Sequence, residues 1–354
     1  MTQTMNKIAL VNDLHFGARN DNQRVADFQE KFFKEIFFPY IDKHDIKIVV
    51  DLGDTFDRRK YVNFYSLDRA KKMFFTPLIE RGIELHVLVG NHDSFYKNTI
   101  ELNSVNLLAE HYDNIVTYQE PKEWNNILMV PWICDSNEEE VFKKVEETKC
   151  PVMFGHLELA GYQMYKGQSI YHGMKDDWLQ KFDLVCTGHY HTKSEQGNVN
   201  YLGCQYEMTW ADADDQKGFH IFDLDKRELE FIHNPNTMFK KIWYNDEDSV
   251  VTDIIDQDLS VYQNCYIKVI VKNKTNPYWF DMFIERLEKQ NPVHLQIVED
   301  HLNLDLEDDD DIIGEAEDTL TILNHYVEAL ETQADKTEVN KVLREIYSEA
   351  LAIT

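Results

Sequence analysis

Residues 86–96 read HVLVGNHDSFY, and this stretch joins an apolar run to a set of polar side chains. Val87–Val89 has the composition of a buried β-strand. A glycine follows the strand, and after it come Asn91, His92 and Asp93. Ligands of α/β proteins bind beyond the carboxyl ends of the strands, so these three side chains are candidates for a ligand site.

The same arrangement recurs at four other places in the chain. Each has Asp, Asn or His directly after an apolar run: NDLH (12–15), LGDTFD (52–57), FGH (154–156) and TGHYH (187–191). These five apolar runs and a sixth, at Ile127–Val130, are predicted strands; the five lie at Lys7–Val11, Lys47–Asp51, Glu84–Val89, Val152–Phe154 and Asp183–Cys186. Segments with helical spacing lie between them, at 22–42, 62–80, 99–111 and 138–148. This alternation predicts an α/β fold with a mixed sheet flanked by helices.

The spacing within these motifs suggests how their side chains converge. Residues two apart in an extended chain point the same way, so Asp13 and His15 can share one target, as can the two histidines of GHYH. Adjacent residues point apart, so Asn91 and His92 can face different targets. A lone Asp or His after a strand is more often a turn residue or a satisfied polar group. Five such places in one chain favour a shared metal site.

Taken in order, the motifs DLH, GD, GNHD, GH and GHYH resemble those of the calcineurin-like metallophosphoesterase superfamily. The resemblance spans roughly residues 7–235 and implies a mixed-sheet αββα core. It implies two metal ions, one held by Asp13, His15, Asp54 and His191 and the other by Asp54, Asn91, His156 and His189, with Asp54 bridging. His92 would face the substrate, and Asp93 would either orient that imidazole or cap a helix.

The expected ligand set has consequences for charge and for the choice of metal. Two divalent ions, two carboxylates and a bridging hydroxide leave a formal charge of about +1. Asn91 adds an oxygen ligand without removing this charge, so the site attracts phosphate. The four imidazoles favour manganese, iron or zinc over magnesium, and the resemblance favours two Mn²⁺ ions. The expected reaction is in-line attack of the bridging hydroxide on a phosphoester, with His92 donating a proton to the developing charge or the leaving oxygen.

Three functions are compatible with such a site. They are a DNA nuclease, a serine/threonine-type phosphoprotein phosphatase or other phosphomonoesterase, and a catalytically silent scaffold. GDTFDRRK (53–60) is similar to the GDxVDRG motif of the phosphatases, whose arginine corresponds to Arg58, but those enzymes have GDxHG where this chain has DLHFG. The scaffold is disfavoured because every expected ligand is present.

The layout of the whole chain resembles SbcD-type nuclease subunits of double-strand-break repair, and more closely the nuclease subunit of the tailed-phage recombination endonuclease. Segment 198–225 resembles the part of that family that follows the GHxH motif. Many cellular members have histidine where Asp57 stands, which leaves the role of Asp57 open. The resemblance implies a DNA exonuclease or endonuclease of recombination, replication and repair. It also implies an SMC-like coiled-coil ATPase as partner and a homodimer, for which segment 62–80 is a candidate interface.

Four segments are expected along the chain. The phosphoesterase domain covers 1–236, a small β-α-β cap covers 237–299, an acidic linker covers 300–314 and amphipathic helices cover 315–354. Within the cap, the predicted strands and helix are Tyr266–Val271, Trp279–Lys289 and His294–Val298. The apolar stripe of the tail helices, which includes Leu320, Leu323, Val327 and Leu330, can dock on the partner ATPase or pack back on the cap.

The net charge of the chain is −28, and it is unevenly distributed. Residues 299–354 contain 17 acidic and 3 basic side chains, a net charge of −14. Such a chain does not bind DNA through a general positive field, so metal ions or a basic partner must supply the attraction. Five cysteines without CxxC spacing indicate reduced thiols. With no signal peptide and no membrane span apparent, we expect a cytoplasmic protein, in the host cytoplasm if it is phage-encoded.

Overall fold

The computed structural model describes residues 6–109, 112–247 and 249–299, together with residues 327, 336, 339 and 342 of the tail. Apart from these four residues, the predicted acidic linker and tail helices lie outside the described part of the chain. Residues up to Ile297 form one compact unit, and those from Val298 onward form a second. The boundaries expected for the domains stay a prediction.

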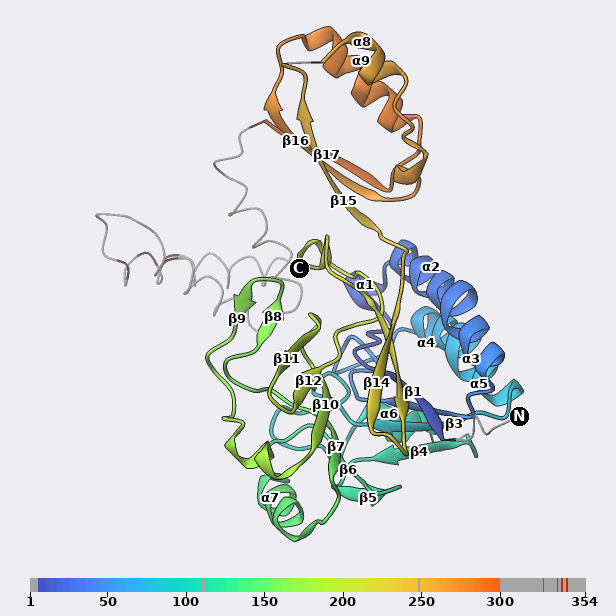
Figure 1. The fold of residues 1–354 in the computed structure, drawn as a ribbon, viewed down its shortest axis with the longest axis vertical. Coiled ribbons are helices and arrows are strands. Elements are labelled where there is room, and N and C mark those ends of the chain that lie inside the picture. The colour runs from blue at the N-terminus through green and yellow to red at the C-terminus, as the bar shows by residue number, and fades with distance from the viewer. Residues whose placement is uncertain are drawn as a thin grey trace. The chain divides into compact units, whose positions relative to one another are not determined.

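Two six-stranded sheets form the centre of the first unit (Figure 1). In spatial order the first contains β14 (Glu228–His233), β13 (Gly218–Asp223), β1 (Lys7–Val11), β2 (Ile48–Asp51), β3 (Glu84–Leu88) and β4 (Ile115–Tyr118). The second contains β11 (Ser194–Gln196), β12 (Val199–Tyr201), β10 (Leu184–Gly188), β7 (Val152–His156), β6 (Ile127–Val130) and β5 (Lys122–Trp124). β1 to β4 run parallel, and β13 and β14 extend that sheet antiparallel. In the second sheet β7 and β10 run parallel and β5 pairs antiparallel with β6, so both sheets are mixed, as the sequence predicts.

Alternation along the strands divides the apolar side chains between two faces of each sheet. In β1, Ile8 and Leu10 belong to a core layer that also contains Phe154 of the second sheet. Ala9 and Val11 belong to a different layer, which contains the helices on the outside of the first sheet. A third layer packs α7 (Glu138–Glu147) against the outside of the second sheet. The predicted αββα arrangement is confirmed.

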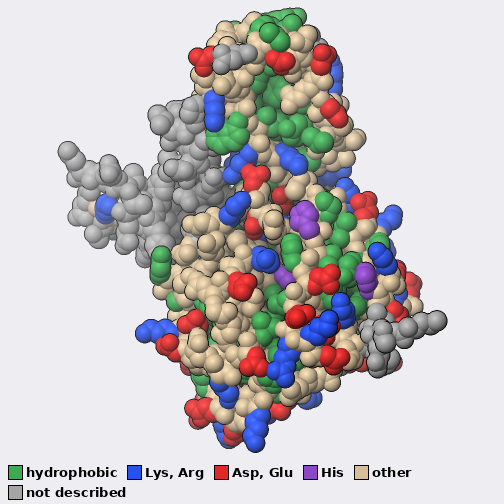
Figure 2. All heavy atoms as spheres, viewed as in Figure 1, with side chains coloured by type: hydrophobic (Ala, Val, Ile, Leu, Met, Phe, Trp, Pro, Cys, Tyr) green, Lys and Arg blue, Asp and Glu red, His purple; other side chains and the backbone are tan. Residues whose placement is uncertain are grey.

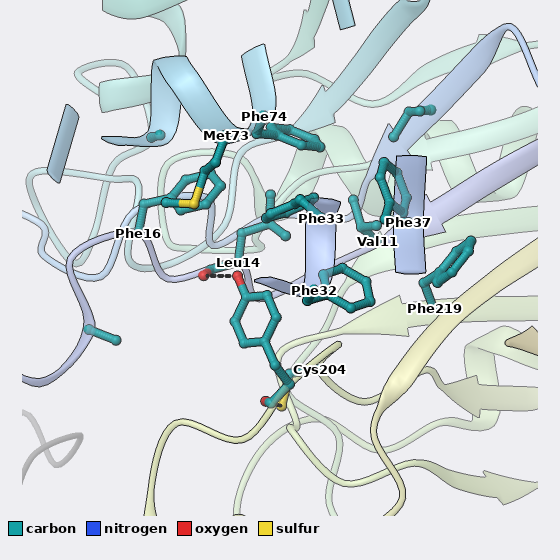
Figure 3. Close-up of a cluster of buried hydrophobic side chains, with 14 of the residues drawn as sticks. Val11, Leu14, Phe16, Phe32, Phe33, Phe37, Met73, Phe74, Cys204 and Phe219 are labelled. Carbon is teal, nitrogen blue, oxygen red and sulfur yellow. Dashed lines mark hydrogen bonds between the residues drawn. The ribbon is translucent and has the colours of Figure 1, made fainter. Parts of the chain in front are cut away.

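The helices over the first sheet are interrupted where the sequence predicts unbroken segments. They are α2 (Gln23–Phe32), α3 (Phe38–His44), α4 (Phe64–Ala70) and α5 (Thr76–Glu80), with the π-helical turns η1 (Phe33–Phe37) and η2 (Lys71–Phe75) between them. Each π turn directly precedes a helix with proline in its first turn. Proline lacks the N–H that a continuous helix needs, so the ladder of hydrogen bonds widens there. Phe33 of η1 packs on Phe74 of η2, with ring centroids 5.1 Å apart (Figure 3).

The cap consists of a three-stranded sheet and two helices. The strands are β15 (Phe239–Asn245), β16 (Tyr266–Asn273) and β17 (His294–Val298), and the helices are α8 (Val251–Ile255) and α9 (Pro277–Glu288). Asn276 caps α9 by accepting hydrogen bonds from the amides of Tyr278 and Trp279. The predicted β-α-β unit is confirmed, and β15 adds a strand parallel to β16 that the sequence analysis did not anticipate. None of the described helices is long and apolar enough to cross a bilayer.

Candidate metal centre

The five polar motifs lie at the carboxyl ends of β1, β2, β3, β7 and β10. Backbone hydrogen bonds join the first two loops: the Asp13 amide donates to Gly53 O at 2.8 Å, and the His15 amide donates to Asp54 O at 3.0 Å. The second sheet reaches the same place, because His156 Nδ1 lies 2.8 Å from Leu52 O. Loops from both sheets therefore contribute to one buried centre.

Four side chains form the first group of this centre. His15 Nε2 lies 3.2 Å from His191 Nε2, and it lies 3.9 Å from both Asp13 Oδ1 and Asp54 Oδ2. All four residues are buried, with at most 5% of each exposed. Two imidazole nitrogens thus point at each other beside two carboxylates.

A second group shares Asp54 with the first. Asn91 Oδ1 lies 2.9 Å from His156 Nε2 and 3.0 Å from His189 Nδ1. Asp54 Oδ2 lies 3.3 Å from His156 Nε2. The structure brings together the same two sets of side chains that the sequence analysis expects for two ions, with Asp54 between them. Their assignment as metal ligands stays a prediction.

The donor set fits divalent cations. Leu52 O accepts a hydrogen bond from His156 Nδ1, so the other ring nitrogen, Nε2, faces the Asn91 amide oxygen. A ring nitrogen and an oxygen acceptor this close share a cation between them, either a proton on Nε2 or a metal ion. Imidazole, carboxylate and amide ligands together suit manganese, iron or zinc better than magnesium.

The electrostatics of the centre also favour positive charge. Burial alone lowers the pKa of His156, but the charge of Asp54 and a hydrogen bond to it raise the pKa to about 9. For His15, burial is likewise outweighed by a hydrogen bond to Asp57 and by three nearby carboxylates, which raise its pKa to about 10. Burial raises the pKa of Asp54, but His156 and His92 hold it well below its usual range. The buried carboxylates therefore attract cations into the centre.

Two glycines make the close approach of the loops possible. A Cβ on Gly90 would lie 2.1 Å from Asp54 Oδ1, and one on Gly53 would lie 2.7 Å from His156 Nδ1. Gly53 also has a φ of +104°, which side chains with a Cβ rarely adopt. Asp13, His15, Asp54 and His189 have positive φ as well, which is a form of backbone strain that clusters at functional sites.

His92 and Asp93 differ from each other in what they contact. The His92 amide donates to Asp54 Oδ1 at 2.8 Å, and its Nδ1 lies 2.6 Å from the carbonyl oxygen of Asp57. Asp93 contacts backbone instead: its carboxylate accepts hydrogen bonds from the amides of Gly90, Asp54, Thr55 and Phe56, and from the Ser104 hydroxyl. The prediction that Asp93 orients His92 is therefore wrong, because the Asp57 carbonyl occupies that position. Asp93 holds together the loops that follow β2 and β3.

Two residues outside the expected ligand set support the centre: Asn12, which sequence reasoning missed, and Asp57, whose role it left open. Asp57 Oδ1 lies 3.5 Å from His15 Nδ1, as expected for a carboxylate that orients a metal-binding imidazole. Asn12 Nδ2 donates to Asp13 Oδ2 at 2.5 Å and to Gly203 O at 3.1 Å. Both residues lie inside the polar motifs NDLH and LGDTFD, and this position could have indicated that they support the centre.

A buried ion pair lies behind His191. Lys217 Nζ lies 2.6 Å from Asp212 Oδ1 and donates to His191 O at 2.8 Å. His191, Cys204 and Asp212 could by proximity hold a further ion. The ammonium of Lys217 neutralises Asp212, however, so this group serves to fix the backbone of His191. No local sequence pattern marks this pair.

Comparisons with known proteins place these residues in a wider context. The model of the calcineurin-like phosphoesterase family matches residues 6–193, which include all seven side chains of the two groups. Exonuclease subunit 1 of Enterobacteria phage T4 is 30% identical, and the match covers 97% of this chain and 99% of that protein. A dimetal phosphatase from Danio rerio is 13% identical with a TM-score of 0.37, covering 65% of this chain and 96% of that one. Nuclease MPE from Pseudomonas putida is 13% identical with a TM-score of 0.30, covering 64% and 87%.

Proposed function

Because the chain belongs to the family of calcineurin-like phosphoesterases, we propose that it is a metal-dependent DNA nuclease, an exonuclease or an endonuclease. The relative from phage T4 is named an exonuclease subunit and matches almost the whole chain. The observation that carries the proposal is the convergence of seven buried or half-buried donor side chains from five loops on one centre. The family implies divalent metal ions, and this donor set is suited to them.

The proposed ligands divide the centre between two ions. Asp13, His15, Asp54 and His191 would hold one ion, and Asp54, Asn91, His156 and His189 would hold the other. Mn²⁺ is the proposed occupant, because four imidazoles suit a softer ion than magnesium. When bound, the two ions polarise the phosphoester and activate the attacking water. The amide of Asn91 adds no negative charge, so the centre stays attractive to a phosphodiester.

His92 is the proposed proton donor to the leaving oxygen. Its Nδ1–H donates to the carbonyl oxygen of Asp57, which fixes the orientation of the ring and directs Nε2 away from that contact. Its ring lies edge-on to that of His15, with centroids 4.9 Å apart, so it is next to the first group. A positioned imidazole of this kind can hold a proton and give it to the departing oxygen.

One experiment separates the nuclease from a phosphatase. Purified protein with Mn²⁺ is incubated in two parallel reactions, one with linear DNA and one with a phosphopeptide. Gel electrophoresis follows the cleavage of the DNA, and release of inorganic phosphate follows the hydrolysis of the phosphopeptide. We expect DNA cleavage that stops when a chelator is added, and no phosphate release from the peptide. Hydrolysis of the phosphopeptide alone would overturn the nuclease proposal in favour of the phosphatase.

The relative is a subunit, so we also propose a partner, an SMC-like coiled-coil ATPase, and a homodimer in the cytoplasm. The charge of the chain supports a partner, since residues 1–298 alone carry a net charge of −14. Acidic and basic side chains are interspersed on the face shown in Figure 2, without a continuous basic surface. A basic partner would overcome this repulsion of DNA.

Deleting residues 312–354 tests the proposed docking of the tail. The truncated protein should keep its metal content and its cleavage of short single strands. It should no longer co-purify with the coiled-coil ATPase and should lose ATP-stimulated cleavage. If the truncated protein binds the ATPase with full affinity, the binding interface is formed by another surface of the chain.

A further inference from the structure

A short segment next to the centre combines positive charge with exposed aromatic rings. Residues 58–65 read RRKYVNFY, with three consecutive cations in a chain whose net charge is −28. Tyr61 is 54% exposed, Phe64 88% and Tyr65 37%. Elsewhere in the described phosphoesterase core, large rings belong mainly to the buried layers. Residues 58–65 thus form an aromatic strip.

The aromatic strip begins beside the proposed catalytic groups. Arg58 follows Asp57, which contacts His15 through its carboxylate and His92 through its carbonyl oxygen. Asp57, Arg58 and Tyr61 also line one shallow hollow in the surface, together with part of the loop that follows β1. A polymer that reaches the centre can therefore contact the strip as well.

The strip is held in place by specific contacts. Asn63 caps α4 by accepting from the Tyr65 amide at 2.9 Å, and its Nδ2 donates to Asp21 Oδ2 at 3.3 Å. The guanidinium of Arg58 lies 5.0 Å from the centroid of the Tyr61 ring and donates to Asn20 Oδ1. Arg58 therefore lies over one face of the Tyr61 ring, yet more than half of the residue stays exposed. Rings fixed in this way lose little freedom when a ligand stacks on them.

Resting on the proposed nuclease function, we propose that the aromatic strip binds unpaired nucleotides of the substrate, with a base stacked on Tyr61 and phosphates near the three cations. Exposed rings interleaved with basic side chains are the combination by which proteins hold single-stranded DNA without reading its sequence. The segment supplies positive charge where the rest of the chain is acidic. Bases in a duplex are stacked on each other, so the strip favours frayed ends and single strands over closed duplex.

The test compares Tyr61→Leu with two matched controls. Tyr61→Phe keeps the ring, and Tyr278→Leu removes a ring of α9 that is 68% exposed and is not part of the strip. With a single-stranded oligonucleotide, Tyr61→Leu should raise KM roughly 5- to 100-fold, from the usual strength of base stacking. Its kcat should stay within about twofold of the wild type. Both controls should behave like the wild type.

A second substrate set identifies stacking as the cause. A series of oligonucleotides carries one abasic site each, at a different position in each strand. At one position the abasic site should weaken binding to the wild-type enzyme, compared with the intact strand, but should not weaken binding to Tyr61→Leu. Equal losses in both proteins would overturn stacking on Tyr61. Hydrolysis of bis(4-nitrophenyl) phosphate, a small diester without bases, reports on the metal centre, and an unchanged circular dichroism spectrum shows that Tyr61→Leu is folded.

The remaining outcomes separate this inference from the proposed function. If the wild type cleaves DNA and Tyr61→Leu has an unchanged KM, the strip does not bind nucleotides and the nuclease proposal stands. If the wild type hydrolyses the small diester but cleaves no DNA, the nuclease proposal fails and this inference fails with it. If Tyr61→Leu changes a dimer into a monomer in sedimentation experiments, the strip binds a second copy of the chain instead.

Discussion

Replacing Asp93 by Asn should destabilise the fold more than it slows the chemistry. The buried carboxylate accepts three amide hydrogen bonds on Oδ2 and one, from Phe56, on Oδ1. An amide side chain can keep the three bonds on its remaining oxygen, but each loses about 1 kcal/mol of charge assistance, and the Phe56 N–H then faces an NH₂ group at a cost of about 1–3 kcal/mol. Burial raises the pKa of Asp93 to about 6, so replacing the carboxylate by a neutral amide recovers about 3 kcal/mol of this loss. We expect a net loss of about 1–3 kcal/mol of folding free energy.

Urea denaturation in the presence of a chelator measures this loss without a contribution from bound metal. Asp135→Asn makes the same chemical change on the surface and should shift the stability by less than about 0.5 kcal/mol. At low temperature, where Asp93→Asn remains folded, its kcat should fall by less than about tenfold. A stability change below about 1 kcal/mol, combined with a fall in kcat above about 100-fold, would refute the structural role of Asp93 and restore a catalytic one.

Three further changes test other parts of the site and its surroundings. Asp54→Asn should abolish hydrolysis and weaken the binding of both ions, since Asp54 lies in both groups; elemental analysis that still finds two ions per chain would contradict the shared ligand. His92→Ser should keep the full metal content but lower turnover about 10²–10⁴-fold, whereas loss of metal would identify His92 as a ligand. Burial raises the pKa of Glu207 from 4.5 to about 7, despite hydrogen bonds from the amides of Phe239 and Met238. The folded state therefore binds this proton more tightly than the unfolded state does. The resulting stabilisation, up to about 3 kcal/mol of folding free energy, is fully present below about pH 4.5 and is lost as the pH rises through 7. In Glu207→Gln this slope should be absent from urea midpoints measured between pH 5 and 8, and an unchanged slope would show that another group titrates.

Runs of apolar residues and helical spacing, which involve only residues close together in the sequence, predicted most of the fold. β1 and β6 have the predicted bounds, because their apolar residues serve two buried layers and leave no ambiguity. β4 and β5 were not predicted, since both are short, lie at sheet edges and expose part of their side chains. The π turns were also missed. Their cause, a proline in the following turn, was present in the sequence.

The site was predictable only as far as its residues follow strands. The seven proposed ligands share that position, and the structure brings them together. The role of Asp93 was not predictable, because its partners Asp54, Thr55 and Phe56 are backbone amides of another loop. Backbone donors carry no side-chain signature, so the sequence could not indicate that this carboxylate binds them. The same reason applies to Lys217, which donates to the backbone of His191.

The order of the motifs along the chain has a consequence for biosynthesis. Asp13, Asp54 and Asn91 leave the ribosome early, but three of the four imidazoles come from the second sheet, as His156, His189 and His191. β1 also lies between β2 and β13, so its second neighbour is made after all the proposed ligands. A chain cut short by premature termination before residue 156 therefore lacks most of the nitrogen ligands of both groups. Such a copy can complete neither group, since the first needs His191 and the second needs His156 and His189.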